Sequence, residues 1–144
     1  MNFTFLEQNN INTTTVLSVT AGTTSIANLF DNDVSNEFIG GTSTCTVTWT
    51  PASGTEIDTA ILRGTGFTSY SIAVTGNTSS TYTQASQTAS AGGNLFLSLQ
   101  TSTATKVLFN LYNAGSTVTV GDLWVGEKLY TFEDNPSPDN YNPS

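Results

Sequence analysis

The residues best suited to chemistry in this sequence form a short acidic segment, Asp31-Asn32-Asp33. Its side-chain oxygens stand at alternate positions. Hard oxygen ligands of this kind suit Ca²⁺, which takes about six to eight oxygens including backbone carbonyls. The same residue types also form Asx turns readily, because their side chains accept hydrogen bonds from backbone N–H groups two positions further on. The segment therefore predicts either a calcium loop or a plain turn.

Aromatic side chains offer a second kind of chemistry, because an aromatic face matches the apolar face of a sugar ring. Trp49 alternates with threonines as a core residue does, and Trp124 lies in a Leu-Trp-Val run, so core packing explains both better than sugar binding. Tyr82 lies in the Ser/Thr-rich stretch 78–92, which we predict to be a loop, and it is the better candidate for an exposed glycan contact. The remaining aromatic candidates are Tyr70, Tyr112 and Phe67.

Paired carboxylates could in principle serve a glycosidase. Two such pairs occur, Glu56 with Asp58 and Glu133 with Asp134, but no pattern places either pair in a cleft, and solvation at the surface explains both. The chain has no histidine, which removes His-based triads and dyads. Its single cysteine, Cys45, excludes an internal disulfide and falls on the inward side of a strand pattern, as a small core residue does. We expect no enzymatic activity.

The charge balance excludes another class of function. The formal net charge is −8, and only three residues are basic (Arg63, Lys106 and Lys128). No basic patch can then neutralise a nucleic-acid backbone, so nucleic acid is not an expected partner. The N-terminus lacks the basic segment and the apolar run of a secretion signal, and no apolar stretch is long enough to span a membrane.

Period-two alternation predicts an all-β fold. Thr, Ser and Asn make up 57 of the 144 residues, and these side chains compete with the backbone for hydrogen bonds, which disfavours helix. Apolar residues alternate with polar ones in short runs, and Gly- or Pro-containing turns separate the runs at intervals of about 8–12 residues. About eight strands follow, including 14–20, 43–50, 57–62, 69–75, 94–100, 105–112 and a stretch from 118 to 125. An antiparallel two-sheet jelly-roll sandwich accommodates them.

The same alternation predicts which side chains are buried. The predicted core consists of Cys45, Val47, Trp49, Ile72, Val74, Leu95, Leu97, Leu99, Val107, Phe109 and Leu111. The C-terminal stretch 132–144 differs in kind, since it has three prolines and no apolar period. We predict a jelly-roll domain over 1–131 and an extended arm over 132–144, stiffened by proline. Phe132 and Tyr141 are its only large apolar groups and its predicted anchors on a neighbouring subunit.

Three segments, in order, resemble discoidin-like (galactose-binding-like) jelly rolls. Residues 29–38 (LFDNDVSNEF) resemble that family's L-[YF]-D-G-[DN]-x-x-T-x-W segment, with Asn32 in place of glycine, Asn36 in place of threonine and Phe38 in place of tryptophan. Residues 46–64 resemble a strand, a tight turn and the I-D-x-I-x-L-x-G strand. Residues 120–126 (VGDLWVG) are similar to the late I-x-E-L-x-V-x-G strand, with Asp122 in the acidic position.

This resemblance carries several expectations about sites and function. Many such domains hold a structural calcium, and the matching residues here are Asp31, Asp33, Asn36 and Asp122; calcium is the one cofactor expected. The late Leu-Trp-Val-Gly-Glu strand running into a Pro-rich arm resembles small structural proteins of tailed-bacteriophage virions. The expected function is thus a virion component of the tail or baseplate, made in the host cytoplasm and binding copies of itself and other virion proteins. The alternatives are a capsid decoration or head-fibre protein, and a module that binds host-surface glycan.

Overall fold

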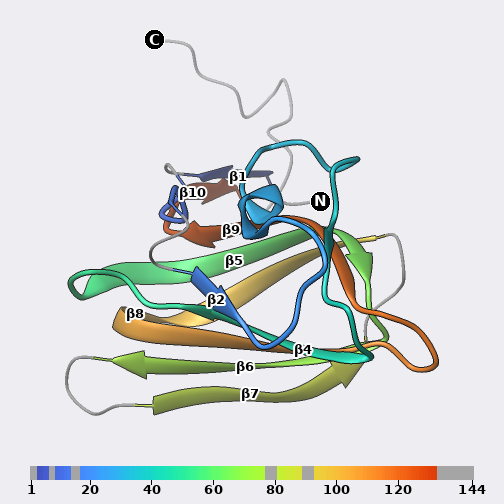
Figure 1. Cartoon of the computed structure of the whole chain (residues 1–144). Helices are drawn as coiled ribbons and strands as arrows, with labels where there is room; N and C mark the ends of the chain where they lie inside the picture. The colour runs from blue at the N-terminus through green and yellow to red at the C-terminus, as the bar shows by residue number, and fades with distance from the viewer. Residues whose placement is uncertain (1–2, 7–8, 14–16, 77–80, 89–92, 133–144) are drawn as a thin grey trace, which may run out of the picture.

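The computed structural model describes residues 3–6, 9–13, 17–76, 81–88 and 93–132, and for 3–6, 81–88, 100–102 and 128–132 it describes the backbone alone (Figure 1). Within these residues the fold is built from strands and one short 3₁₀ helix, Ile26–Leu29, that Ser25 caps. No helix in this part of the chain is long and apolar enough to cross a membrane. The strands are β1 (Phe3–Leu6), β2 (Leu17–Val19), β3 (Phe38–Ile39), β4 (Thr44–Trp49), β5 (Thr55–Gly66), β6 (Ser69–Gly76), β7 (Thr81–Thr88), β8 (Asn94–Tyr112), β9 (Thr119–Gly126) and β10 (Lys128–Phe132).

Eight strands, β2 to β9, form one curled antiparallel sheet that folds into two layers (Figure 1). The first part of β8 pairs with β5, β5 pairs with β9, and β9 pairs with β3. The last part of β8 lies between β4 and β6 and so belongs to the other layer, with β2 and β7 outside them. The predicted all-β jelly-roll sandwich is confirmed, with its two layers joined through β8.

Two boundaries differ from the sequence prediction. The segments 94–100 and 105–112 are one strand of 19 residues, because β8 continues through Ala104, which is fully buried and pairs with both β5 and β6. The stretch 78–92, predicted to be a loop, contains strand β7, whose backbone pairs with β6. Its Ser and Thr side chains do not prevent an extended backbone, since β-branched threonine fits a pleated sheet well.

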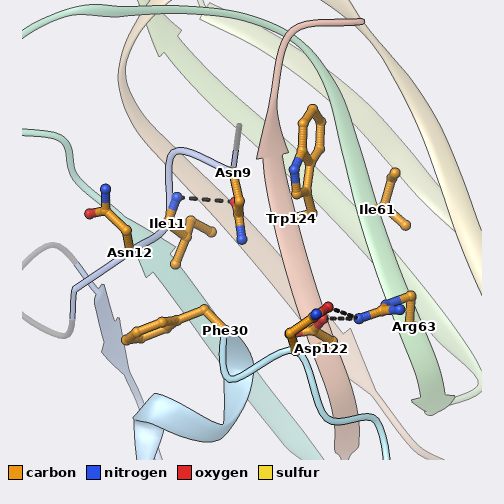
Figure 2. A pocket seen from close by; sticks show the side chains of 9 residues that line it. Asn9, Ile11, Asn12, Phe30, Ile61, Arg63, Asp122 and Trp124 are labelled. Carbon is orange, nitrogen blue, oxygen red and sulfur yellow. Dashed lines mark hydrogen bonds and ion pairs between the residues drawn. The ribbon is translucent and has the colours of Figure 1, made fainter. Parts of the chain in front are cut away.

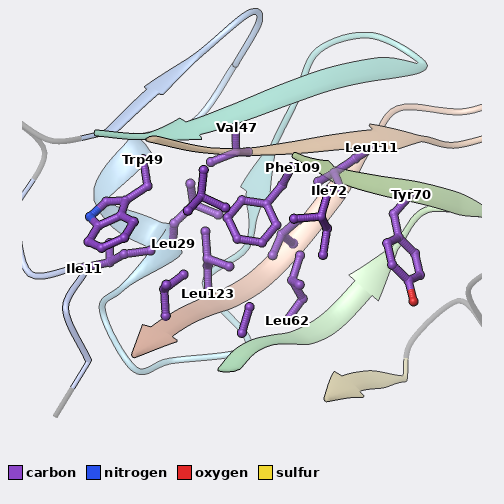
Figure 3. Close-up of a cluster of buried hydrophobic side chains, with 14 of the residues drawn as sticks. Ile11, Leu29, Val47, Trp49, Leu62, Tyr70, Ile72, Phe109, Leu111 and Leu123 are labelled. Atoms are coloured by element: carbon purple, nitrogen blue, oxygen red, sulfur yellow. The ribbon is translucent and has the colours of Figure 1, made fainter. Parts of the chain in front are cut away.

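The core lies between the two layers (Figure 3). Trp49 from β4 and Phe109 from β8 are each 1% exposed and pack among Leu29, Leu62 and Leu123. Ten of the eleven residues predicted to be buried are buried. Leu95 is the exception: it is half-buried and packs on the margin of the core, near the start of β8.

A separate two-stranded sheet joins the chain ends, where β1 pairs with β10. Phe132, the predicted first residue of the arm, is the last residue of β10, and its backbone pairs with Phe3. The remainder of the predicted arm, including Tyr141, lies outside the described residues. The division into a domain over 1–131 and an arm over 132–144 therefore stays a prediction, as does docking through Phe132 and Tyr141.

Candidate ligand-binding site

A pocket of about 520 Å³ opens on the outer face of β5 and β9 (Figure 2). Two cross-strand pairs form its floor: Ile61 lies opposite Trp124, and Arg63 lies opposite Asp122. This arrangement follows from the pleat, because residues two apart on a strand point to the same side of the sheet. Leu123 and Val125, which alternate with Asp122 and Trp124 on β9, point into the core and are buried. The pocket is within the size range of small-ligand sites, about 300–1,000 Å³.

The N-terminal segment forms one wall of the pocket. The Asn9 side chain replaces a neighbouring strand at the free edge of β9: its Nδ2 donates to the Leu123 carbonyl (3.1 Å), and its Oδ1 accepts from the Val125 N–H (3.0 Å). The Asn9 Oδ1 also accepts from the Ile11 N–H (3.1 Å), which turns the chain so that Ile11 is buried. The exposed Asn12 side chain follows on the same wall.

The loop that follows the 3₁₀ helix forms a second wall, with Phe30 and Asn32 lining the pocket. Asn32 has φ of +61°, in the left-handed region, which asparagine adopts more readily than most residues. The family pattern has glycine at this position, so the backbone conformation explains why asparagine can replace it. The loop packs closely on β5 and β9 because Gly64 and Gly121 have no Cβ; a Cβ at either position would lie 2.8 Å from Val34 Cγ1.

The charged pair on the pocket floor has one bond to the loop. Arg63 Nη2 forms an ion pair with Asp122 Oδ2 and donates to Asn32 Oδ1 at 2.9 Å (Figure 2). The side chain of Arg63 is 37% exposed and that of Asp122 only 10%. The second carboxylate oxygen, Asp122 Oδ1, is buried and has no hydrogen-bond partner among the described residues. A buried acceptor in this state costs free energy until a donor reaches it.

The predicted calcium ligands form two separate groups of contacts. Asp31 accepts from the Asp33 N–H (2.9 Å) and from Asn36 Nδ2 (2.7 Å). Asp33 accepts hydrogen bonds from the hydroxyl (2.6 Å) and the N–H (3.0 Å) of Ser35. Both bonds hold the pKa of Asp33 below its usual value, and the bond from the hydroxyl has the larger effect. Asp122 instead pairs with Arg63. Among the described residues no three His, Cys, Asp or Glu side chains gather in one place. Calcium also binds backbone carbonyls and Asn side chains, so calcium binding stays a prediction.

The aromatic candidates take different places. Trp49, Phe67 and Tyr70 are buried, and burial raises the pKa of the Tyr70 hydroxyl. Tyr112 is 44% exposed on the outer face of the other layer. Tyr82 belongs to strand β7 rather than to a loop, where its backbone pairs with Val74, and its side chain lies outside what the structure describes.

Trp124, predicted to pack in the core, instead lies on the outer face of β9. It is half-buried and lines the pocket. The sequence contained a signal for this outward position, because Asp122 and Trp124 alternate with the apolar residues Leu123 and Val125. Arg63, Asn9 and Phe30 gave no comparable signal, since each reaches the pocket through a contact between segments far apart in the chain. Of the carboxylates considered for catalysis, Glu56 and Asp58 lie on β5 outside the residues that line this pocket, and Glu133 and Asp134 lie outside the described residues.

The chain matches no protein-family model and no curated protein sequence. Solved structures with a similar fold include carbohydrate-binding domains. Chitosan-binding module 1 of a chitosanase/glucanase from Paenibacillus sp. IK-5 has a TM-score of 0.62 at 16% identity, over 76% of this chain and 92% of that one. A Clostridium perfringens module in complex with GalNAc-β-1,3-galactose has a TM-score of 0.61 at 14% identity, over 76% and 93%. A mutant of the lectin binding domain of Lectinolysin complexed with Lewis b has a TM-score of 0.64 at 10% identity, over 83% and 96%.

These likenesses establish that the chain has the discoidin-like jelly-roll fold, as the sequence motifs predicted. At identities between 10% and 16% they establish the fold alone. The three likenesses give no support for a role in a bacteriophage virion.

Proposed function

We propose that this protein is a non-catalytic carbohydrate-binding module, which holds a sugar residue in the pocket between β5, β9, the N-terminal segment and the Phe30–Asn32 loop. The observation that carries the proposal is the pairing of a half-exposed tryptophan with hydrogen-bonding side chains in one concave site. Trp124 and Ile61 offer an apolar surface to the face of a sugar ring. Asn12, Asn32 and Asp122 offer polar groups to its hydroxyls.

The comparisons support this proposal in one respect. Neighbours that share the fold over nearly their whole length are described by the sugars they bind, which include chitosan, GalNAc-β-1,3-galactose and Lewis b. A fold does not fix a function by itself, so the argument rests on the pocket and not on the likeness. The virion role and the virion location stay predictions from the sequence. Neither conflicts with glycan binding, because a particle can carry a module that attaches to host-surface polysaccharide.

The proposal is tested by binding of the purified protein to a glycan microarray, followed by titration of the glycans it retains. Trp124→Ala removes the stacking surface, and we expect at least a tenfold loss of affinity for every retained glycan, on the scale of about 1–3 kcal/mol that a stacked aromatic contributes. Tyr112→Ala is the matched control, since it removes an aromatic ring that is 44% exposed on the other layer. Equal losses in the two variants, or binding to no glycan, would contradict the proposal.

A further inference from the structure

Among the described residues that line the pocket, Arg63 is the one basic side chain, and its charge is already neutralised. The Arg63 guanidinium forms an ion pair with Asp122 and also bonds to Asn32. An arginine that recognises a carboxylate usually does so through a bidentate pair and an uncompensated charge. Here the pair presents little net charge to a ligand. The described lining therefore holds no uncompensated positive charge for an acidic sugar.

The carboxylate of Asp122 disfavours a second carboxylate in the pocket. Asp122 Oδ1 is buried and unpartnered within the described part of the chain, and the residue as a whole is 7% exposed. A carboxylate only accepts hydrogen bonds, so Asp122 cannot pair with the carboxylate of an acidic sugar. Uronic and sialic acids offer hydroxyl donors as neutral sugars do, but their carboxylate beside Asp122 would place two negative charges together.

The described charged side chains on the adjoining loop are also acidic. Asp31 and Asp33 lie exposed on the loop that supplies Asn32, and the whole chain carries a net charge of −8. Lys106 lies on β8, where it pairs with Thr75 of β6 in the other layer. Repulsion between like charges at a binding site discriminates strongly between ligands of similar shape.

From this arrangement we infer that the pocket prefers neutral sugar residues to those that carry a carboxylate, with Asp122 as the residue that sets the preference. The inference rests on the proposed function and adds a ligand class to it. Asp122 acts in two ways: it cancels the charge of Arg63 through Oδ2, and its own negative charge repels a ligand carboxylate.

The first test compares matched probes on the intact protein. One pair is a highly methyl-esterified pectin and the same pectin after de-esterification, which differ in charge along one chain. Neutral glycans and their uronate- or sialate-bearing counterparts on a microarray supply further pairs. We expect Trp124-dependent binding to the neutral member to be at least tenfold tighter at low salt, with a smaller difference at high salt because ions screen exposed charges. Equal or tighter Trp124-dependent binding to the acidic members would overturn the inference and leave the proposed function standing. Absence of Trp124-dependent binding to any glycan would contradict the proposed function itself.

The second test changes the preference. Asp122→Asn keeps the shape of the side chain and removes its charge, so Arg63 is left unneutralised; we expect the preference for neutral glycans to shrink by about tenfold or to reverse. The double variant Arg63→Gln/Asp122→Asn leaves no charge on the pocket floor. We expect it to lose the preference for neutral glycans without gaining a preference for acidic ones. It serves as the test if an unpaired Arg63 disturbs folding in the single variant. Glu56→Gln removes one exposed negative charge outside the pocket and should alter the preference by less than about twofold. An unchanged preference in both Asp122 variants would overturn the assignment.

Discussion

The two layers of the sandwich each contain a tryptophan, and they use it in opposite ways. On β4, Trp49 points inward and is 1% exposed, while the outer face of that layer carries Thr46, Asn110 and Ser71 in one hydrogen-bonded row. On β9, Trp124 points outward and is half-buried, and the inward positions belong to Leu123 and Val125.

The difference between the two outer faces shows what makes a binding site here. Both faces contain polar side chains and an accessible aromatic ring, Tyr112 on one and Trp124 on the other. On the β4–β8–β6 face the Thr46–Asn110–Ser71 row already satisfies its own hydrogen bonds. On the β5–β9 face two flanking segments enclose Trp124, and the buried Asp122 Oδ1 lacks a partner. The larger cavity, about 520 Å³ against about 210 Å³ beside Tyr112, distinguishes the site more than residue type does.

The largest expected effect separates the two tryptophans by stability. Trp49→Ala should lower the free energy of unfolding by about 3–5 kcal/mol, because it leaves a cavity in the core. Trp124→Ala should lower it by about 1–2 kcal/mol, since part of that side chain is already in water in the folded state. Urea unfolding of the two variants beside the parent protein measures both values. A loss at Trp124 as large as that at Trp49 would place Trp124 in the core and remove the contrast.

Calcium would add a second difference between the faces, because the predicted ligands lie only on the β5–β9 side. An ion bound to the folded protein alone would stabilise it by about 2.7 kcal/mol at a concentration one hundred times its dissociation constant. If Asp31, Asp33 and Asn36 hold calcium, chelation should lower the melting temperature of the parent protein, and Asp31→Asn should abolish the dependence on calcium. Identical melting curves in calcium and in chelator would remove the calcium prediction.

Alternation in the sequence was enough to predict the fold, and it failed where neighbouring strands decide the outcome. Trp49, Val47 and Cys45 each alternate with threonine, and all three are buried as predicted. The strand β7 was missed because its Ser- and Thr-rich sequence lacks an apolar period, and its extended backbone instead depends on pairing with β6. Strand β8 was divided in two because a strand that passes from one layer to the other interrupts its own inside–outside pattern.

The binding site was less predictable than the fold. The acidic position of Asp122 was recognised and assigned to calcium, whereas the contact it makes is with Arg63, whose position depends on the register between β5 and β9. Asn9 acts through hydrogen bonds to residues 114 and 116 positions away. No local pattern encodes a contact of that length.

The Asn9 contact supplies a smaller test of the enclosed face. Asn9→Ala should lower the free energy of unfolding by about 1–3 kcal/mol, because the Leu123 carbonyl and the Val125 N–H lose their partner at the edge of β9. Hydrogen exchange at the Val125 amide should accelerate at the same time. The matched control is Asn12→Ala, which changes an exposed side chain on the same wall and should alter stability by less than about 0.5 kcal/mol. Unaltered protection of the Val125 amide would show that the segment is held by other contacts.

The smallest expected effect concerns Asp33, on the loop that encloses one side of the pocket. Its pKa lies below the usual 3.8 chiefly because the Ser35 hydroxyl donates to it at 2.6 Å. A lowered pKa means that the charged carboxylate is favoured in the folded state. Its contribution to the stability of the loop is therefore present above pH 3.8 and is lost as the pH falls through the folded-state value.

Ser35→Ala should raise the pKa of Asp33 toward 3.8 without reaching it, since the N–H of residue 35 still donates at 3.0 Å. An NMR titration of the Asp33 carboxyl carbon measures the shift, with Ser53→Ala as a distant control. Because Asp33 is fully exposed, global stability should hardly change, whereas acid should loosen the loop around Asn32 at a higher pH in the variant. An unchanged pKa would mean that the hydroxyl bond does not persist in solution, and the loop wall of the pocket would then rest on the packing of Val34 against Gly64 and Gly121.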